Sequence, residues 1–414
     1  MFDQIVKKIR SNGRVLKNIS YLGLIQIFNL CFPFVTYPYL ISKLGLHLYG
    51  EVILYQTAIA YVSILVNYGF NISGVRLISK SKSELETNKI VTTIYLIKLS
   101  LFLISIIFLC VLLGVYEKIN HILLLSSLTL VFNELLFPQW YFQAKEKLKF
   151  VTLLSFVVKL VSLFSLFLFI KSELDYIYVP LMTGVGYLIV GIVSSYLLYK
   201  NKVRLVAIDY KQVRSIFTES SHFFLTSAVI SIKNKFDIFI VGAIIGKEAV
   251  AIYDMALKIY NISLMPISVI NNAIFAHMAK GKNTKFLKST LKNTFLVSII
   301  ICTVVYFISP VAIEVMSNGN RVDDIHSILA VLLISIPLFS VGLTLAQNGL
   351  IVQGFSKLHL LGMISTTVVY LTGVGIIFAI GVETKLSAYA TLTVLVYLYE
   401  MLYRIYFCRK YKIL

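Results

Sequence analysis

Long apolar runs separated by short charged or turn-forming clusters make up most of the chain. A run of about 20 apolar residues is long enough to cross a bilayer as an α-helix. The pattern predicts twelve such helices, at residues 19–41, 51–70, 90–115, 120–142, 151–170, 176–199, 219–244, 249–278, 287–309, 325–350, 358–381 and 386–408. We therefore expect an all-α integral membrane protein with little folded mass outside the bilayer.

Lysine and arginine are concentrated in alternate connections. The N-terminal segment and the connections around residues 80–89, 145–149 and 200–214 are rich in them, whereas the intervening loops hold single residues such as Lys118 and Lys171. Because cytoplasmic loops of membrane proteins are enriched in these residues, both termini are predicted to be cytoplasmic. An even number of spans agrees with this alternation.

Composition supports the same class of protein. The chain is 58% hydrophobic and 14% charged, with a mean hydropathy of +0.86, whereas a soluble domain has about 25% charged residues. An ordinary water-soluble enzyme is therefore excluded. The net charge of +19 would suggest nucleic acid in a soluble protein, but the loop bias accounts for it, so no nucleic-acid partner is expected. Scattered cysteines indicate neither a disulfide framework nor a zinc site.

The two halves of the chain resemble each other. Residues 143–148 match residues 353–358, and Leu44-Gly45 matches Ile245-Gly246. Both matches align the sequence of the first six spans with that of the last six. This predicts two lobes of the same topology, related by an axis along the membrane normal, as in transporters. The predicted organisation is a cytoplasmic N-terminal segment, an N-lobe, a cytoplasmic linker, a C-lobe and a cytoplasmic tail, at residues 1–18, 19–199, 200–215, 216–408 and 409–414.

Several ionisable residues lie inside the predicted spans, where each costs about 2.5–3.5 kcal/mol on insertion scales and usually faces protein or water. Three pairs of opposite charge are four residues apart. Such residues share one helix face and can neutralise each other; the pairs are Lys233 and Asp237, Asp254 and Lys258, and Glu400 and Arg404.

Three other lysines have no acidic neighbour one helical turn away: Lys98, Lys159 and Lys235. Lys159, Lys235 and the nearby Lys233 fall near the middle of spans in both halves, which predicts a central cationic cavity. Phosphate groups satisfy several lysine donors at once, so an anionic, phosphate-bearing ligand is expected. The alternative is that each lysine pairs with a carboxylate such as Glu134 or with a carbonyl on a neighbouring helix.

Catalytic motifs are missing from the sequence. It contains no HExxH, P-loop or GxGxxG pattern, and the longest predicted non-cytoplasmic connection, about residues 316–325, is too short for an enzymatic domain. We therefore expect no enzyme, cofactor or metal site. Without a nucleotide site, transport would depend on an ion gradient or on the substrate's own concentration.

Two motifs resemble those of a known family. Residues 137–147 read FPQWYFQAKEK and resemble the P-x-W-x-F-Q-G-x-E-K signature of Wzx-type polysaccharide repeat-unit flippases, with Ala144 in place of the usual glycine. Residues 234–253 resemble their N-x-D-x-x-x-x-G-x-x-x-G-x-x-A-V-x-x-Y pattern, which the wider multidrug, oligosaccharidyl-lipid and polysaccharide exporter superfamily shares more loosely. The resemblance extends over the full length and implies the MATE-like arrangement of two six-helix lobes.

The resemblance implies a function as well. Such proteins move an undecaprenyl-diphosphate-linked oligosaccharide, the repeat unit of O-antigen or capsule, from the cytoplasmic to the periplasmic leaflet of the bacterial inner membrane by alternating access. Expected partners are the lipid-linked substrate, membrane lipids, the O-antigen polymerase and the chain-length regulator, with H⁺ or Na⁺ as the candidate coupling ion.

Roles for individual residues follow as hypotheses. The substrate-binding cations are Lys159, Lys233 and Lys235, with Lys98 at the inner entrance. The coupling or charge-partner residues are Asp237, Asp254, Lys258 and Glu134. The motif residues with structural or gating roles are Pro138, Trp140, Gln143, Glu146 and Lys147.

Three other functions remain as alternatives. A multidrug cation antiporter needs an acidic cavity, whereas lysines outnumber acids at mid-depth here. A membrane polysaccharide polymerase carries a large periplasmic loop. Other lipid-linked glycan flippases are close cousins, although lipid II flippases typically have fourteen spans.

Overall fold

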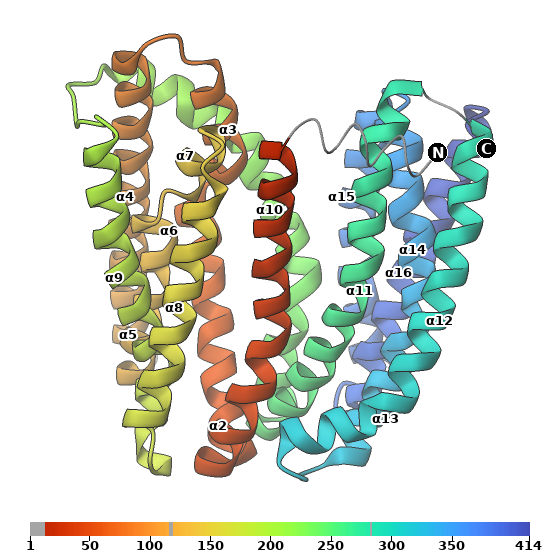
Figure 1. Ribbon diagram of the computed structural model, residues 1–414. Coiled ribbons are helices and arrows are strands. Elements are labelled where there is room, and N and C mark those ends of the chain that lie inside the picture. The colour runs from red at the N-terminus through yellow and green to blue at the C-terminus, as the bar shows by residue number, and fades with distance from the viewer. Residues whose placement is uncertain (1–12, 116–118, 282–283) are drawn as a thin grey trace. The chain divides into compact units, whose positions relative to one another are not determined.

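The computed structural model describes residues 13–115, 119–281 and 284–414, and this part of the chain is helical without strands (Figure 1). It divides into two compact units. Unit 1 comprises Met1–Gly45 and Tyr55–Ala228, and unit 2 comprises Leu46–Leu54 and Val229–Leu414. The predicted boundary between lobes, at the 200–215 linker, lies upstream of this division, and the predicted segment 1–18 falls largely outside the described residues.

Unit 1 contains most of the helices of the first half of the chain. They are α2 (Gly13–Asn67), α3 (Phe70–Lys80), α4 (Glu84–Val115), α5 (His121–Leu128), η1 (Thr129–Val131), α6 (Phe132–Leu136), α7 (Gln139–Ala144), α8 (Leu148–Phe169), η2 (Glu173–Ile177), α9 (Tyr178–Lys200) and the first half of α10 (Tyr210–Ile244).

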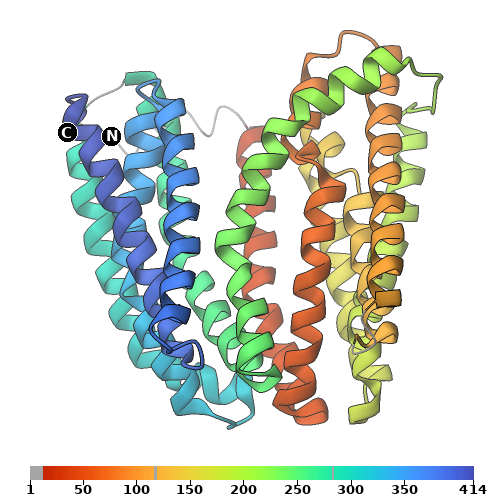
Figure 2. The same cartoon turned by 180° about the vertical axis from the view of Figure 1, so that it is seen from behind.

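Unit 2 contains the second half of α10, a short segment of α2 and the remaining helices. These are α11 (Lys247–Gly281), α12 (Thr284–Ser317), α13 (Val322–Leu333), α14 (Ser335–Thr344), the π-helix η3 (Leu345–Ile351), α15 (Ser356–Ala379) and α16 (Leu386–Lys410). Helix α16 packs against α13, α14 and α15, as Figure 2 shows from behind.

Helices occur over each of the twelve ranges predicted from the sequence. Among the described residues, nine segments are long and apolar enough to cross a membrane. The first two predicted spans are counted together because α2 is continuous across them and the segment Cys31–Lys80 is taken as one. Helices α10 and α11 are not among the nine, and they carry charged residues such as Lys233, Asp237 and Asp254. The multi-pass, all-helical class is confirmed, and the number of twelve spans stays a prediction.

A glycine bend divides α2 into two helices. Gly45 has φ 69° and ψ 171°, outside the helical region, in a conformation that residues with a Cβ rarely adopt. The glycine aligned with it by the predicted repeat, Gly246, also has positive φ, at 121°. A glycine with positive φ therefore follows the first helix of each half.

The α2 segment in unit 2 packs closely against the start of α11. A Cβ on Gly50 would lie 1.7 Å from the carbonyl oxygen of Lys247, so only glycine fits at this contact. One residue further on, a carboxylate oxygen of Glu51 lies 2.8 Å from Nζ of Lys247. Steric fit and charge together join the two segments.

The core of unit 1 is built around the buried Trp140 of α7. Gly74 on α3 lets the indole approach, because a Cβ there would lie 3.1 Å from Trp140, and Tyr95 on α4 packs at a centroid distance of 6.2 Å. The predicted motif thus lies where α3, α4 and α7 meet in the hydrophobic core.

Candidate functional site

A polar cavity of about 310 Å³ lies within unit 2. Residues from α10, α14, η3, α15 and α16 line it, and its polar side chains are Lys233, Asn234, Gln347, His359, Thr366, Thr367, Tyr397, Glu400 and Arg404. Buried polar groups are costly unless they are paired, so a cluster of this kind inside an apolar helical unit marks a site for a polar ligand.

Three charged residues form a network at this cavity. Nζ of Lys233 lies 3.1 Å from one carboxylate oxygen of Glu400, and the guanidinium of Arg404 donates to the other. The predicted pair of Glu400 and Arg404 is present, but Lys233 pairs with Glu400 rather than with Asp237. Two cations share one carboxylate, so the network carries excess positive charge that favours an anion.

The carboxylate of Asp237 is bound by two tyrosines. It is 5% exposed and accepts hydrogen bonds from the hydroxyls of Tyr253, at 3.0 Å, and of Tyr370. These donors come from α11 and α15 and take the place that Lys233 was expected to fill. This explains why the expected pair along α10 does not form.

The other predicted charges of unit 2 lie near the junction of α10 and α11. Asp254 is buried and accepts from the Tyr49 hydroxyl at 3.3 Å, with Nζ of Lys258 at 3.9 Å. The predicted pair of Asp254 and Lys258 is therefore present. Lys235 is partly buried and makes neither a hydrogen bond nor an ion pair within the described part of the chain.

The two predicted lysines of unit 1 contact aromatic rings. Nζ of Lys159 lies 5.0 Å from the centroid of Phe32. Lys98 is 1% exposed, donates to the backbone carbonyl of Glu134 at 2.6 Å and lies 5.9 Å from the ring of Trp140. Lys98 and Glu134 are thus in contact, in agreement with the alternative prediction that a lysine pairs with a carbonyl on a neighbouring helix.

A second pocket, of about 250 Å³, lies beside Glu134 in unit 1. The Glu134 carboxylate accepts hydrogen bonds from the side-chain amides of Asn67 and Asn133. Ser63, Asn71 and Ser227 complete its polar lining together with Asn67. Amides, hydroxyls and a carboxylate can donate to and accept from the hydroxyls of a sugar.

The motif of residues 137–147 builds a turn between α6 and α8. Pro138 precedes α7, Gln143 is exposed near its end, and Glu146 takes the left-handed conformation with φ 56°. The ammonium of Lys147 donates to the side-chain oxygen of Asn201 at the end of α9. This segment therefore joins α7, α8 and α9.

Sequence reasoning missed several residues that line the two pockets. From the sequence, Glu400 and Arg404 read as a pair on one helix face rather than as a binding site. The neutral residues give no signal, because an isolated amide, tyrosine or histidine is common in membrane helices. The missed residues are Asn67, Asn71, Asn234, Gln347, His359, Tyr397, Glu400 and Arg404. Among the described residues, no group of three His, Cys, Asp or Glu side chains could hold a metal ion.

Comparison with solved structures defines the fold. The lipid II flippase MurJ, in an inward closed conformation, aligns with a TM-score of 0.76 at 15% identity, covering 95% of this chain and 87% of that chain. A multidrug resistance MATE family transporter of the MOP superfamily, in an inward-facing conformation, aligns with a TM-score of 0.73 at 14% identity and 94% coverage of both chains. The predicted MATE-like fold is confirmed.

Sequence relatives identify the family. A profile of the family described as "Polysaccharide biosynthesis protein" matches residues 15–282. A protein of Shigella dysenteriae named "Putative O-antigen transporter" is 31% identical over 267 residues, which cover 64% of this chain and 67% of that protein. The chain spans about two thirds of the length of the curated relatives it matches.

Fold and relatives together place this chain among membrane transporters rather than enzymes, as the sequence predicted. It belongs to the polysaccharide biosynthesis protein family. The resemblance based on residues 137–147 and 234–253 is thereby confirmed.

Proposed function

We propose that this chain is a flippase that moves a lipid-linked oligosaccharide across the membrane by alternating access. The support is its family, the flippase and exporter fold, and relatives named as O-antigen transporters. The proposed substrate is the undecaprenyl-diphosphate-linked repeat unit of O-antigen or capsule, moved from the cytoplasmic to the periplasmic leaflet of the bacterial inner membrane. Both termini are proposed to be cytoplasmic, with twelve spans in two lobes.

The shared carboxylate of Glu400 is the observation that carries the proposal. Lys233 and Arg404 both contact it at a polar cavity, and an arriving diphosphate offers each cation a stronger, multiply charged partner. The cations can therefore exchange Glu400 for phosphate and return to it after release. This keeps the site intact when no substrate is bound.

The remaining predicted cations are assigned roles of their own. Lys235 has no ion-pair partner among the described residues, and we propose that it and Lys159 attract the substrate's charge. Lys98 is buried against the Glu134 carbonyl, so its proposed role is to support the polar pocket of unit 1. Sugar hydroxyls would bind at that pocket through Asn67, Asn71 and Glu134.

The acidic residues of unit 2 are the proposed coupling groups. Asp237 and Asp254 are buried carboxylates that accept from tyrosine hydroxyls, and binding of H⁺ or Na⁺ would change their charge.

The polyprenyl chain would stay in the bilayer, because each CH₂ withdrawn from an apolar environment into water costs about 0.8 kcal/mol. Polymerase and chain-length regulator are the proposed downstream partners.

Complementation tests this function. The gene would be expressed in a bacterium that lacks its own repeat-unit flippase and supplies the matching lipid-linked glycan, and surface polysaccharide would be measured. Lys233→Ala and Arg404→Ala should each reduce the polysaccharide by about tenfold or more, as expected for loss of a charge-assisted contact. The matched control is Arg409→Ala, an exposed arginine on the same helix, which should leave the amount unchanged. Normal polysaccharide in both cavity variants, at normal protein levels, would refute the assigned site.

A further inference from the structure

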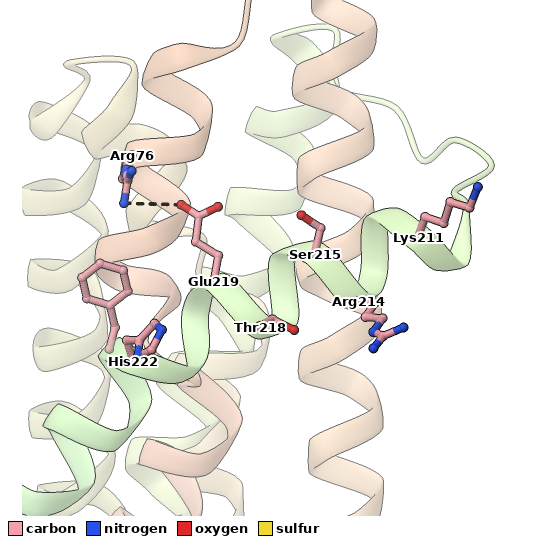
Figure 3. A pocket seen from close by; sticks show the side chains of 8 residues that line it. Arg76, Lys211, Arg214, Ser215, Thr218, Glu219 and His222 are labelled. Atoms are coloured by element: carbon pink, nitrogen blue, oxygen red, sulfur yellow. Dashed lines mark ion pairs between the residues drawn. The ribbon is translucent and has the colours of Figure 1, made fainter.

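A third pocket, of about 670 Å³, lies in unit 1 between α3 and the first turns of α10 (Figure 3). Arg76 of α3 and the residues Lys211, Arg214, Thr218, Glu219 and His222 of α10 line it. It shares no residue with the two pockets described above. Its cations are not part of the proposed transport site.

The α10 residues of this pocket lie on one side of the helix. Lys211, Arg214, Thr218 and His222 are separated by three or four positions, which places them on one face. Figure 3 shows Arg76 directed toward Glu219, with Arg214 and Lys211 nearer the start of α10. The pocket therefore offers a row of side chains that starts at the N-terminus of α10.

Positive charge exceeds negative charge in the pocket. Arg76 lies 3.6 Å from a carboxylate oxygen of Glu219. Within the part of the chain that the structure describes, Lys211 and Arg214 have no ion-pair partner. Three cations and one carboxylate thus line the pocket, and only Arg76 is paired with the carboxylate, so an anion would add partners for Lys211 and Arg214.

Contacts beneath the pocket fix its two walls relative to each other. The hydroxyls of Ser73 on α3 and Ser220 on α10 are buried and 2.8 Å apart. Below them, Tyr68 stacks on Phe217 and Phe224 with centroid distances of 4.3 and 4.8 Å. The two helices are held together by polar and aromatic contacts, so the backbone positions that carry the donors are fixed before a ligand binds.

We propose that this pocket binds the phosphate headgroup of a membrane lipid. Phosphate oxygens accept from arginine, lysine and hydroxyl donors, all of which line the pocket. Lys211 and Arg214 belong to the basic connection at residues 200–214, which the sequence predicts to be cytoplasmic, and lysines and arginines near the cytoplasmic leaflet attract anionic lipid headgroups. Two kinds of lipid carry such a headgroup. One is the lipid-linked glycan with its diphosphate, and this choice rests on the proposed function. The other is an anionic phospholipid of the surrounding bilayer.

The test is headgroup binding by the full-length protein in nanodiscs of phosphatidylcholine. One arm titrates undecaprenyl diphosphate and the other phosphatidylglycerol, with bound lipid counted by native mass spectrometry. The double variant Lys211→Gln with Arg214→Gln should weaken binding by about fivefold for each removed charge. The charge-matched control, Lys200→Gln with Lys202→Gln, changes exposed lysines outside the pocket and should bind like the original protein.

A variant that removes a negative charge from the pocket is expected to have the opposite effect on binding. Glu219→Gln removes the carboxylate that occupies Arg76 and should tighten binding, since a competing negative charge is lost. Weakening of the diphosphate arm identifies the glycan carrier as the ligand, and weakening of the phosphatidylglycerol arm alone identifies bilayer phospholipid. Unchanged binding of both lipids in the double variant overturns the proposal. Because the readout is binding, it can succeed even if the complementation test of transport fails.

Discussion

Lys233 on α10 and Glu400 on α16 form an ion pair with an Nζ to Oε2 distance of 3.1 Å, although they are 167 positions apart in the chain. The same carboxylate binds Arg404 one helical turn further along α16. Removal of one member of such a network leaves the others with uncompensated charge in partly desolvated surroundings. The network therefore contributes to stability, and the proposed substrate site includes it.

Glu400→Gln is expected to destabilise the protein strongly. Breaking a buried pair by removing one partner costs about 3–5 kcal/mol, and here two cations lose their counter-charge. The melting temperature in detergent, measured as the loss of the monodisperse peak in size-exclusion chromatography after heating, reports the effect. The control is Glu248→Gln, whose partner Arg321 is half exposed and whose exposed pair contributes about 0–1 kcal/mol. Equal melting temperatures for the two variants would contradict the importance of the network.

Gly50→Ala tests the close approach of α2 to α11. The added methyl would meet the Lys247 carbonyl oxygen at 1.7 Å, and overpacking of this kind costs about 1–3 kcal/mol or more when backbone must move. Gly375→Ala on α15 is the control, because its Cβ would have nothing within 4 Å and alanine favours a helix by roughly 0.5–1 kcal/mol. A lower melting temperature for Gly50→Ala and an unchanged or higher one for Gly375→Ala are expected.

Tyr370→Phe removes one of the two hydroxyls that bind Asp237. Hydrogen bonds to charged groups contribute about 1.5–3 kcal/mol, so the free energy of unfolding should fall by about that amount. Tyr196→Phe, at an exposed tyrosine without a hydrogen bond among the described residues, should have no effect. The contact would be judged unimportant if denaturant unfolding gave the same midpoint for both variants.

Lys147→Ala separates a structural role of the motif from a role in binding. Its ammonium holds Asn201 at the end of α9, so the variant should lower the melting temperature and the amount of folded protein. Transport per folded molecule should remain within about twofold, because a contact that is the same in both states of a reaction does not change its rate. Lys145→Ala, two residues away and exposed, is the control. A normal melting temperature combined with lost transport would assign Lys147 to the substrate path instead.

The sequence by itself determined the class of protein, the helix positions and the family. Runs of about 20 apolar residues can be stable only in a bilayer, and their backbone groups must then be satisfied within helices. Such constraints act locally along the chain, so they can be read without coordinates. The glycines at 45 and 246 and the motif around Trp140 were recognisable for the same reason, since each depends on the conformation of a few neighbouring residues.

The tertiary structure alone decided which charges meet. Lys233 could be paired from helical spacing only with Asp237, yet Glu400 on α16 takes that place and tyrosines of α11 and α15 bind Asp237 instead. Spacing along one helix fixes which residues share a face, but the packing of other helices decides what that face contacts. An amide such as Asn67 becomes part of a pocket only when another helix brings Glu134 beside it, and this depends on contacts between residues far apart in the chain.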